Sequence, residues 1–197
     1  SAAGGRVVLS HSGGFGLGTA TAATLVPDLD LGITVLTNGA PVGLPEAVTQ
    51  AFVEEVMYGN QTRDWVAGYG ARFAHFADPA GDLVGQTAPA GAAAAGPLSD
   101  YVGTYANDYF GTLTVSEKDG VLYGAMGPQG GYTFAITPWN GDTMAFVPHG
   151  ENALPGSLSS AIFTRGGGKV NGVTLSYFNQ YPQVDEPSGL GIFTRTS

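Results

Sequence analysis

The stretch from Ser10 to Gly18, Ser-His-Ser-Gly-Gly-Phe-Gly-Leu-Gly, contains the residues whose types and spacing suggest chemistry. A glycine-rich segment after an apolar strand can open a nucleotide-binding unit, or it can form one wall of a hydrolase active site. The dinucleotide pattern is Gly-x-Gly-x-x-Gly at the start of a helix, whereas the spacing here is Gly14-x-Gly16-x-Gly18. The threonine-rich residues that come next favour a strand over a helix. We therefore prefer the second interpretation.

Three strands are expected to position this stretch. Apolar and β-branched residues predict strands over 6–10, 19–26 and 31–37, with the first strand running into a glycine-rich turn. Pro27 and Asp28 predict the turn of a hairpin between the second and third strands.

One amphipathic helix is predicted over residues 45–58. Pro45 near its start and Gly59 beyond its end are typical helix boundaries. Apolar side chains recur at helical spacing, at Val48, Phe52, Val53 and Val56. Residues 60–84 are irregular, with room for a short helix, and the Ala/Gly/Pro-rich residues 85–97 read as a linker.

The remainder of the chain is a series of about eight short β-rich runs between turn signals, which predicts a small closed barrel or a sandwich. The runs are 101–105, 110–116, 121–126, 132–137, 143–147, 158–164, 172–179 and 190–195. The tetrapeptide Ile-Phe-Thr-Arg occurs at 162–165 and again at 192–195, which suggests two strands in similar environments. The fold class expected for the whole chain is mainly β (α+β).

Residues 5–60 resemble the C-terminal portion of the serine β-lactamase-like hydrolases. That family includes penicillin-binding-protein-like enzymes, esterases and D-amino-acid-specific peptidases (the D-aminopeptidase branch). Its third active-site motif is Lys-Thr-Gly in the β-lactamases and often His-x-Gly in the esterase and peptidase branches. The matching triplet here is His11-Ser12-Gly13, followed by Gly14. The segment 27–38 and the helix at 45–58 resemble the next strands and the closing helix of that family's sheet.

The resemblance implies roles for five residues. The N–H group of Gly14 would help to form an oxyanion hole. Ser12 would hydrogen-bond the substrate or relay a proton, and His11 would tune the electrostatics of the site or shuttle a proton. Gly13 and Phe15 would contact the substrate. The alternative is that His11 merely ends a strand and that the two glycines only make a turn.

The Ser-x-x-Lys nucleophile motif of that family has no match in this sequence. Lys118 and Lys169 are the only lysines, and neither has a serine three positions before it. Tyr105-Ala106-Asn107 has the form of the second motif but lies downstream of the third, so we interpret it as chance. The expected partner is therefore an N-terminal catalytic segment of the same parent protein, or a second copy of this chain. The expected reaction is acyl transfer to serine, followed by hydrolysis of an ester, amide or β-lactam in a small molecule or peptide.

Residues 98–197 resemble the lipocalin-like barrel that is appended to many of these hydrolases. The matching positions are Tyr101, Gly103, Tyr105, Gly111, Leu113, Val115, Gly120 and Leu122. The expected organisation is thus a hydrolase-derived segment (1–60), a connection (61–97) and a barrel domain (98–197). A different class of function is also open: a non-catalytic barrel that binds or interacts, with an N-terminal arm for association.

Composition narrows the range of partners. The net charge of −9 argues against nucleic acid, which requires a basic surface. No apolar stretch is long enough to predict a membrane span. His75 and His149 are isolated, so no metal site is predicted, and no cofactor is expected. The residues do not fix a compartment, although the family resemblance is compatible with export to the periplasm or the medium.

Overall fold

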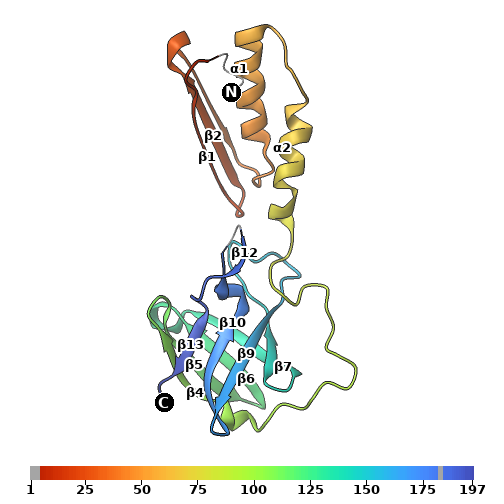
Figure 1. Ribbon diagram of the computed structural model, residues 1–197, viewed down its shortest axis with the longest axis vertical. Helices are drawn as coiled ribbons and strands as arrows, with labels where there is room; N and C mark the ends of the chain where they lie inside the picture. Colours follow the sequence, from red (N-terminus) through yellow and green to blue (C-terminus); the bar gives the residue numbers. More distant parts are fainter. Residues whose placement is uncertain (1–4, 182–183) are drawn as a thin grey trace. The chain divides into compact units, whose positions relative to one another are not determined.

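The computed structural model describes residues 5–181 and 184–197, and it divides the chain into two compact units, Ser1–Asp78 and Pro79–Ser197 (Figure 1). The first unit is a three-stranded sheet with two helices, and the second is a closed antiparallel barrel of eight strands. The expected fold class, mainly β with such a barrel, is confirmed.

The sheet of the first unit has the order β1-β2-β3, formed by β1 (Leu9–Phe15), β2 (Thr19–Val26) and β3 (Leu31–Thr37). A 3₁₀ turn over Pro27–Leu29 connects β2 to β3, as the turn residues predict. The expectation for the first strand was wrong in its bounds, because β1 includes Gly13 and Gly14 rather than ending before them. The turn comes later, at residues 16–18, where Gly18 has a φ of 109° that suits glycine.

Helix α1 (Leu44–Tyr58) packs on β2 and β3, and α2 (Trp65–Phe73) packs on α1. The small side chains of Ala20 and Ala22 are buried on the face of β2 that α1 covers, which allows the helix to approach closely. The helix was predicted correctly, but its apolar stripe is only partly buried. Val53 is 4% exposed, whereas the three other members of the stripe are 39–50% exposed: Val48, Phe52 and Val56.

A buried carboxylate joins the two helices. Glu54 accepts hydrogen bonds from the Thr62 N–H (2.8 Å), the Thr62 hydroxyl (2.9 Å) and the Trp65 indole N–H (2.8 Å). The main-chain hydrogen bond from Thr62 is the largest of the effects that hold the pKa of Glu54 below its usual value. The Glu54 side chain of α1 therefore holds Thr62 of the loop and Trp65 at the start of α2.

The barrel unit has an up-and-down topology in which each strand pairs with its neighbours along the chain, and β13 closes the ring between β10 and β4. A small sheet of β11 (Gln180–Tyr181) and β12 (Val184–Pro187) lies in the connection between β10 and β13. The barrel strands are β4 (Gly103–Asn107), β5 (Gly111–Lys118), β6 (Val121–Met126), β7 (Tyr132–Asn140), β8 (Thr143–Phe146), β9 (Ser159–Gly166), β10 (Lys169–Leu175) and β13 (Ile192–Arg195).

The barrel interior is filled by side chains from alternate positions of every strand. Tyr101, Tyr105, Leu113, Leu122 and Phe146 are each at most 1% exposed, and all belong to one apolar cluster. Because the interior is packed in this way, the barrel is built as a solid core rather than as a container.

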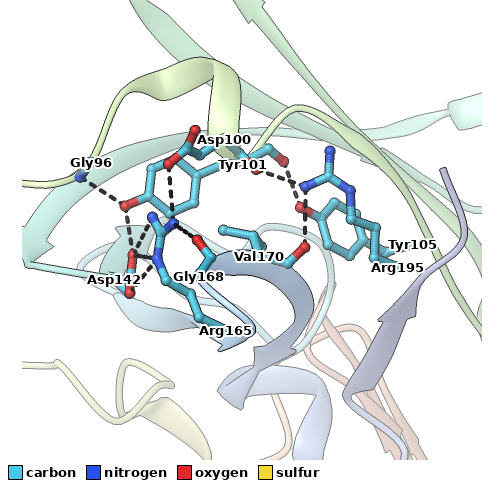
Figure 2. A network of polar contacts seen from close by, with 9 residues as sticks. All are labelled: Gly96, Asp100, Tyr101, Tyr105, Asp142, Arg165, Gly168, Val170 and Arg195. Atoms are coloured by element: carbon cyan, nitrogen blue, oxygen red, sulfur yellow. Dashed lines mark hydrogen bonds and ion pairs between the residues drawn. The ribbon is translucent and has the colours of Figure 1, made fainter.

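The repeated tetrapeptide occupies equivalent places on the two sides of β10. Phe163 of β9 and Phe193 of β13 both lie opposite Val173, and Thr164 and Thr194 both lie opposite Gly172. Both phenylalanines are buried. The expectation that the two copies share an environment is confirmed, and their arginines lie at the same end of the barrel (Figure 2).

Residues 79–97, here called the strap, are held to the barrel along their length. Leu158 donates its N–H to the Ala80 carbonyl, and Leu83 donates its N–H to the Leu158 carbonyl. Gly81 has a φ of 120°, and a Cβ there would collide with the Leu158 carbonyl oxygen, so glycine is required. Farther along, the Ala93 N–H donates to Asn140 Oδ1 (2.9 Å), and the Ala93 carbonyl accepts from Gly141.

Asp82 provides the polar anchor of the strap. Its carboxylate accepts hydrogen bonds from the Ser159 hydroxyl (2.7 Å), the Ser160 hydroxyl (2.6 Å) and the Ser160 N–H (2.9 Å). Burial alone would raise the pKa of Asp82, but the hydrogen bonds from Ser160 and Ser159 outweigh it and lower the pKa. Ser159 and Ser160 are themselves buried; Asp82 accepts from both hydroxyls, and the Ser160 hydroxyl also lies 2.7 Å from the Ser176 hydroxyl.

Replacing Asp82 with alanine should lower the free energy of unfolding of the barrel unit by about 2 kcal/mol, because two buried hydroxyls lose a charged acceptor. Urea unfolding followed by Trp139 fluorescence, in a Trp65→Phe background, measures this. Asp108→Ala, an exposed carboxylate in the β4–β5 turn, is the control and should change little.

The contribution of Asp82 to the free energy of unfolding depends on pH with a definite sign. The pKa of Asp82 is lower in the folded protein than its ordinary value of 3.8, so its contribution is complete above that value and is lost as the pH falls through the folded value. An equal loss in the Asp82 and Asp108 variants would contradict the anchor role.

Candidate functional site

The five residues singled out by sequence all lie on β1, an edge strand that pairs only with β2 among the described residues. Their partners across the pair run from Ala23 opposite His11 to Thr19 opposite Phe15. The motif is thus displayed along one free strand edge, where an extended substrate chain can add its own main-chain hydrogen bonds.

Neighbouring residues of β1 point to opposite faces of the sheet. Ser12 and Gly14 lie opposite Ala22 and Ala20, on the face that α1 covers. His11, Gly13 and Phe15 therefore lie on the other face. The strand brings the five residues into one row, but it does not place His11 and Ser12 on the same side.

The second face of the sheet carries four large apolar side chains that no described element of this unit covers. Leu9, Phe15, Leu25 and Leu36 are between 51% and 74% exposed. The first two belong to β1 and the others to β2 and β3, and the strand register places all four on the face of His11. We call this patch of four large side chains the uncovered sheet face. Exposed apolar patches of this kind mark contact surfaces.

The two glycines of the motif differ in their surroundings. A Cβ on Gly14 would lie 2.8 Å from Pro41 Cβ and 3.3 Å from the Thr19 carbonyl oxygen, so Pro41 of the β3–α1 connection excludes any side chain there. A Cβ on Gly13 would have its nearest contact, Thr21 Oγ1, at 3.7 Å. The same Thr21 hydroxyl donates to the Gly13 carbonyl at 3.3 Å. Gly14 is therefore fixed by packing as well as by any role in chemistry.

His11 and Ser12 have exposed side chains without a hydrogen-bond partner in the part of the chain that the structure describes. No serine with a lysine three residues later accompanies them in the sequence, and both lysines belong to the barrel unit. Among its described residues, the first unit thus presents groups that can bind or transfer a proton, but no serine paired with an activating base.

A second group of polar side chains, which sequence reasoning missed, closes the short-turn end of the barrel (Figure 2). Arg165 donates from Nε to Asp142 at 2.9 Å and from Nη1 to Asp100 at 3.0 Å. Asp142 also accepts from the Tyr101 hydroxyl at 2.7 Å. The hydrogen bonds of Asp142 raise the pKa of Arg165, and those of Arg165 lower the pKa of Asp142. The only sequence signal for this group was the repeated Ile-Phe-Thr-Arg.

Arg195, from the second copy of the repeat, lies on the other side of Val170 from Arg165 (Figure 2). Its guanidinium donates to the main-chain oxygens of Asp100 (2.7 Å), Val102, Val170 (3.3 Å) and Ser197 (3.3 Å), and its Cζ lies over the Tyr105 ring, 5.7 Å from the centroid. It makes no ion pair with a side-chain carboxylate among the described residues. Two equivalent arginines thus have different partners.

Comparison with known proteins identifies the second unit. A sequence profile described as "Domain of unknown function (DUF3471)" matches residues 87–187, about half of the chain. The chain belongs to the DUF3471 family. The match includes part of the strap and all barrel strands except β13.

One solved structure is similar to this chain in sequence. The C-terminal domain of penicillin binding protein Rv0907 is 45% identical, and the alignment covers 57% of this chain and 97% of that domain, with a TM-score of 0.45. The relationship rests on the identity over almost the whole of that domain. The expectation of a penicillin-binding-protein-like parent is thereby supported.

Another solved structure, SurE with D-Leu, is 21% identical with a TM-score of 0.35. The alignment covers 96% of this chain and 35% of that one, and a likeness at this level supports no conclusion about function. No curated protein matches the chain. Within the described ranges, no helix has the length and hydropathy needed to cross a membrane.

Gly14→Ala should destabilise the first unit by about 1–2 kcal/mol, because the new methyl group forces Pro41 or β1 to move. Gly13→Ala is the matched control, and its cost should be well below that. Unfolding followed by Trp65 fluorescence in a Trp139→Phe background reports on this unit alone. Equal effects of the two substitutions would show that Pro41 does not constrain the strand.

Proposed function

We propose that this chain is the C-terminal portion of a penicillin-binding-protein-like serine hydrolase and that β1 forms one wall of its active site. The observation that carries the proposal is the 45% identity to the C-terminal domain of a penicillin binding protein. The motif His11-Ser12-Gly13 on a free strand edge is consistent with it. The reaction proposed is acyl transfer to a serine, followed by hydrolysis of an ester, amide or β-lactam.

Each residue of β1 has a proposed role in that reaction. The Gly14 N–H helps to stabilise the oxyanion, where a positioned donor contributes about 3 kcal/mol. His11 shuttles a proton or tunes the electrostatics of the site, and Ser12 hydrogen-bonds the substrate. Gly13 and Phe15 contact the substrate on the uncovered sheet face. Histidine in place of the lysine of the β-lactamases removes a permanent positive charge, which favours an ester or peptide substrate over a β-lactam carboxylate.

The partner that completes the site is proposed to be a preceding catalytic segment of the same protein. Two surfaces of the first unit support this. The uncovered sheet face exposes Leu25 and Leu36, and α1 exposes the stripe that includes Phe52, so both sides of the layer have apolar area to bury. A segment that covered the sheet face would also bring its nucleophile next to His11.

The barrel is proposed to act as a packing domain rather than as a carrier of an apolar ligand. Its interior is occupied by the buried aromatic and aliphatic side chains described above, among them Tyr105 and Phe146. The lipocalin-like relationship suggested by sequence stays a prediction.

A non-catalytic association module is the second candidate. It is favoured by one observation, the free edges of β1 and β3, which suit pairing with a second copy of the chain. Native mass separates the two candidates: a stable dimer of this chain that buries both edges supports association, whereas association only with a chain that carries the nucleophile supports the hydrolase.

The parent protein should react with a fluorophosphonate probe at a serine outside these 197 residues. His11→Ala in that protein should slow acylation by about 100-fold, the contribution expected of a positioned proton-transfer group. The rate of labelling and the turnover of a p-nitrophenyl ester measure this.

The matched control is His75→Ala, a histidine of the 3₁₀ segment Ala74–Ala77, which should leave the rate unchanged. Labelling of a serine within this chain would overturn the proposal that the nucleophile belongs to a preceding segment. An equal loss of activity in the two histidine variants would remove His11 from the mechanism.

A further inference from the structure

Positive charge is scarce in this protein, yet the basic residues of the barrel unit gather at one end. The unit contains Lys118, Arg165, Lys169 and Arg195, in a chain whose net charge is −9. All four lie next to the short β-turns or the closing strand end, at the end of the barrel opposite the long connections. Two of them, Lys169 and Arg195, line an open cleft of about 410 Å³ together with Ser99, Asp100, Gly168 and Val170.

The acidic residue of this cleft, Asp100, is ion-paired with an arginine that it shares with Asp142. Asp100 pairs with Arg165 at 3.0 Å, and Arg165 pairs with Asp142 at 2.9 Å on its other side. One oxygen of the Asp100 carboxylate, Oδ2, is therefore engaged by Arg165. The remaining charges that line the cleft are both positive.

The cleft contains one hydrogen-bond donor group that the fold orients and two that have no partner among the described residues. Four main-chain oxygens, those of Asp100, Val102, Val170 and Ser197, accept hydrogen bonds from the Arg195 guanidinium and fix its plane. The Lys169 ammonium and the Ser99 hydroxyl are exposed and have no hydrogen-bond partner among the described residues. A pre-oriented arginine beside a free lysine and a free hydroxyl is an arrangement that suits an oxyanion.

We propose that this cleft binds the oxyanion group, carboxylate or phosphate, of a small ligand. Lys169 supplies the main charge-assisted hydrogen bond, Ser99 a neutral one, and Arg195 a fixed positive charge at the base of the cleft. The site lies within the barrel unit and does not rest on the proposed hydrolase function.

The experiment is a titration of the full chain with inorganic phosphate and, separately, with acetate, followed by ¹H–¹⁵N NMR. Saturable shifts should be confined to residues 98–103, 167–170 and 195. Sodium chloride at the same ionic strength provides the reference for screening. Saturation by phosphate alone identifies a phosphorylated ligand, and saturation by acetate alone or by both anions identifies a carboxylate site; each result supports the proposal.

Lys169→Gln should weaken binding about tenfold, the effect of one lost charge-assisted hydrogen bond. Lys118→Gln makes the same change of charge on β5, outside the cleft, and should weaken binding little. Because both side chains are exposed, neither variant should lose its fold, and unfolding curves check this. Equal weakening by the two variants, or shifts that sodium chloride reproduces, would overturn the proposal.

Discussion

Closure of the barrel at β10 is the constraint on which the second unit depends. In an up-and-down sheet, every other side chain faces the core, and that core is sealed only when the last strand meets the first. Here β13 provides the seal, and it does so by repeating on one side of β10 the sequence that β9 presents on the other. Phe163 and Phe193 fill the core beside Val173, so the two copies make equivalent contributions to packing.

The same repeat distributes charge unequally at the end of the barrel. Arg165 is committed to two carboxylates, whereas Arg195 is committed to main-chain carbonyls. The difference arises from position, because Asp142 lies in the β7–β8 turn within reach of β9, while β13 lies beside the main chain that leads into β4. One arginine therefore belongs to an ion-pair network, and the other is half-buried, held by main-chain oxygens, and lines the cleft.

Much of this architecture could be predicted from local patterns. β-branched residues marked β2, β3 and most barrel strands, and Pro45 with Gly59 marked α1, because these signals act within a few residues. The extent of β1 could not be read in this way: Gly13 and Gly14 suggested a turn, but pairing with Thr21 and Ala20 keeps them extended. The strap was also hidden, because Ala93 is held through its main chain, and composition does not report main-chain hydrogen bonds.

The candidate site was only partly accessible to sequence. The motif located the strand, and alternation along β1 then separates His11 from Ser12, which spacing alone did not reveal. Burial of the α1 stripe was not determined by its periodicity either. Helical spacing shows which side chains share a face, but it does not show whether another element covers that face, and here Val48, Phe52 and Val56 stay exposed.

The two units differ in how they expose the edges of their strands. The closed ring of eight strands has no free strand edge, whereas β3, with the sequence Leu-Gly-Ile-Thr-Val-Leu-Thr, pairs only with β2 in the part of the chain that the structure describes. That segment is rich in β-branched residues and has neither charge nor proline, the composition of segments that stack into cross-β fibrils. Asp28 and Asp30 just before it are the nearest charges along the chain that oppose such stacking. Aggregation of the isolated chain should therefore begin at β3, and the colloidal behaviour of the protein is decided by the smaller unit.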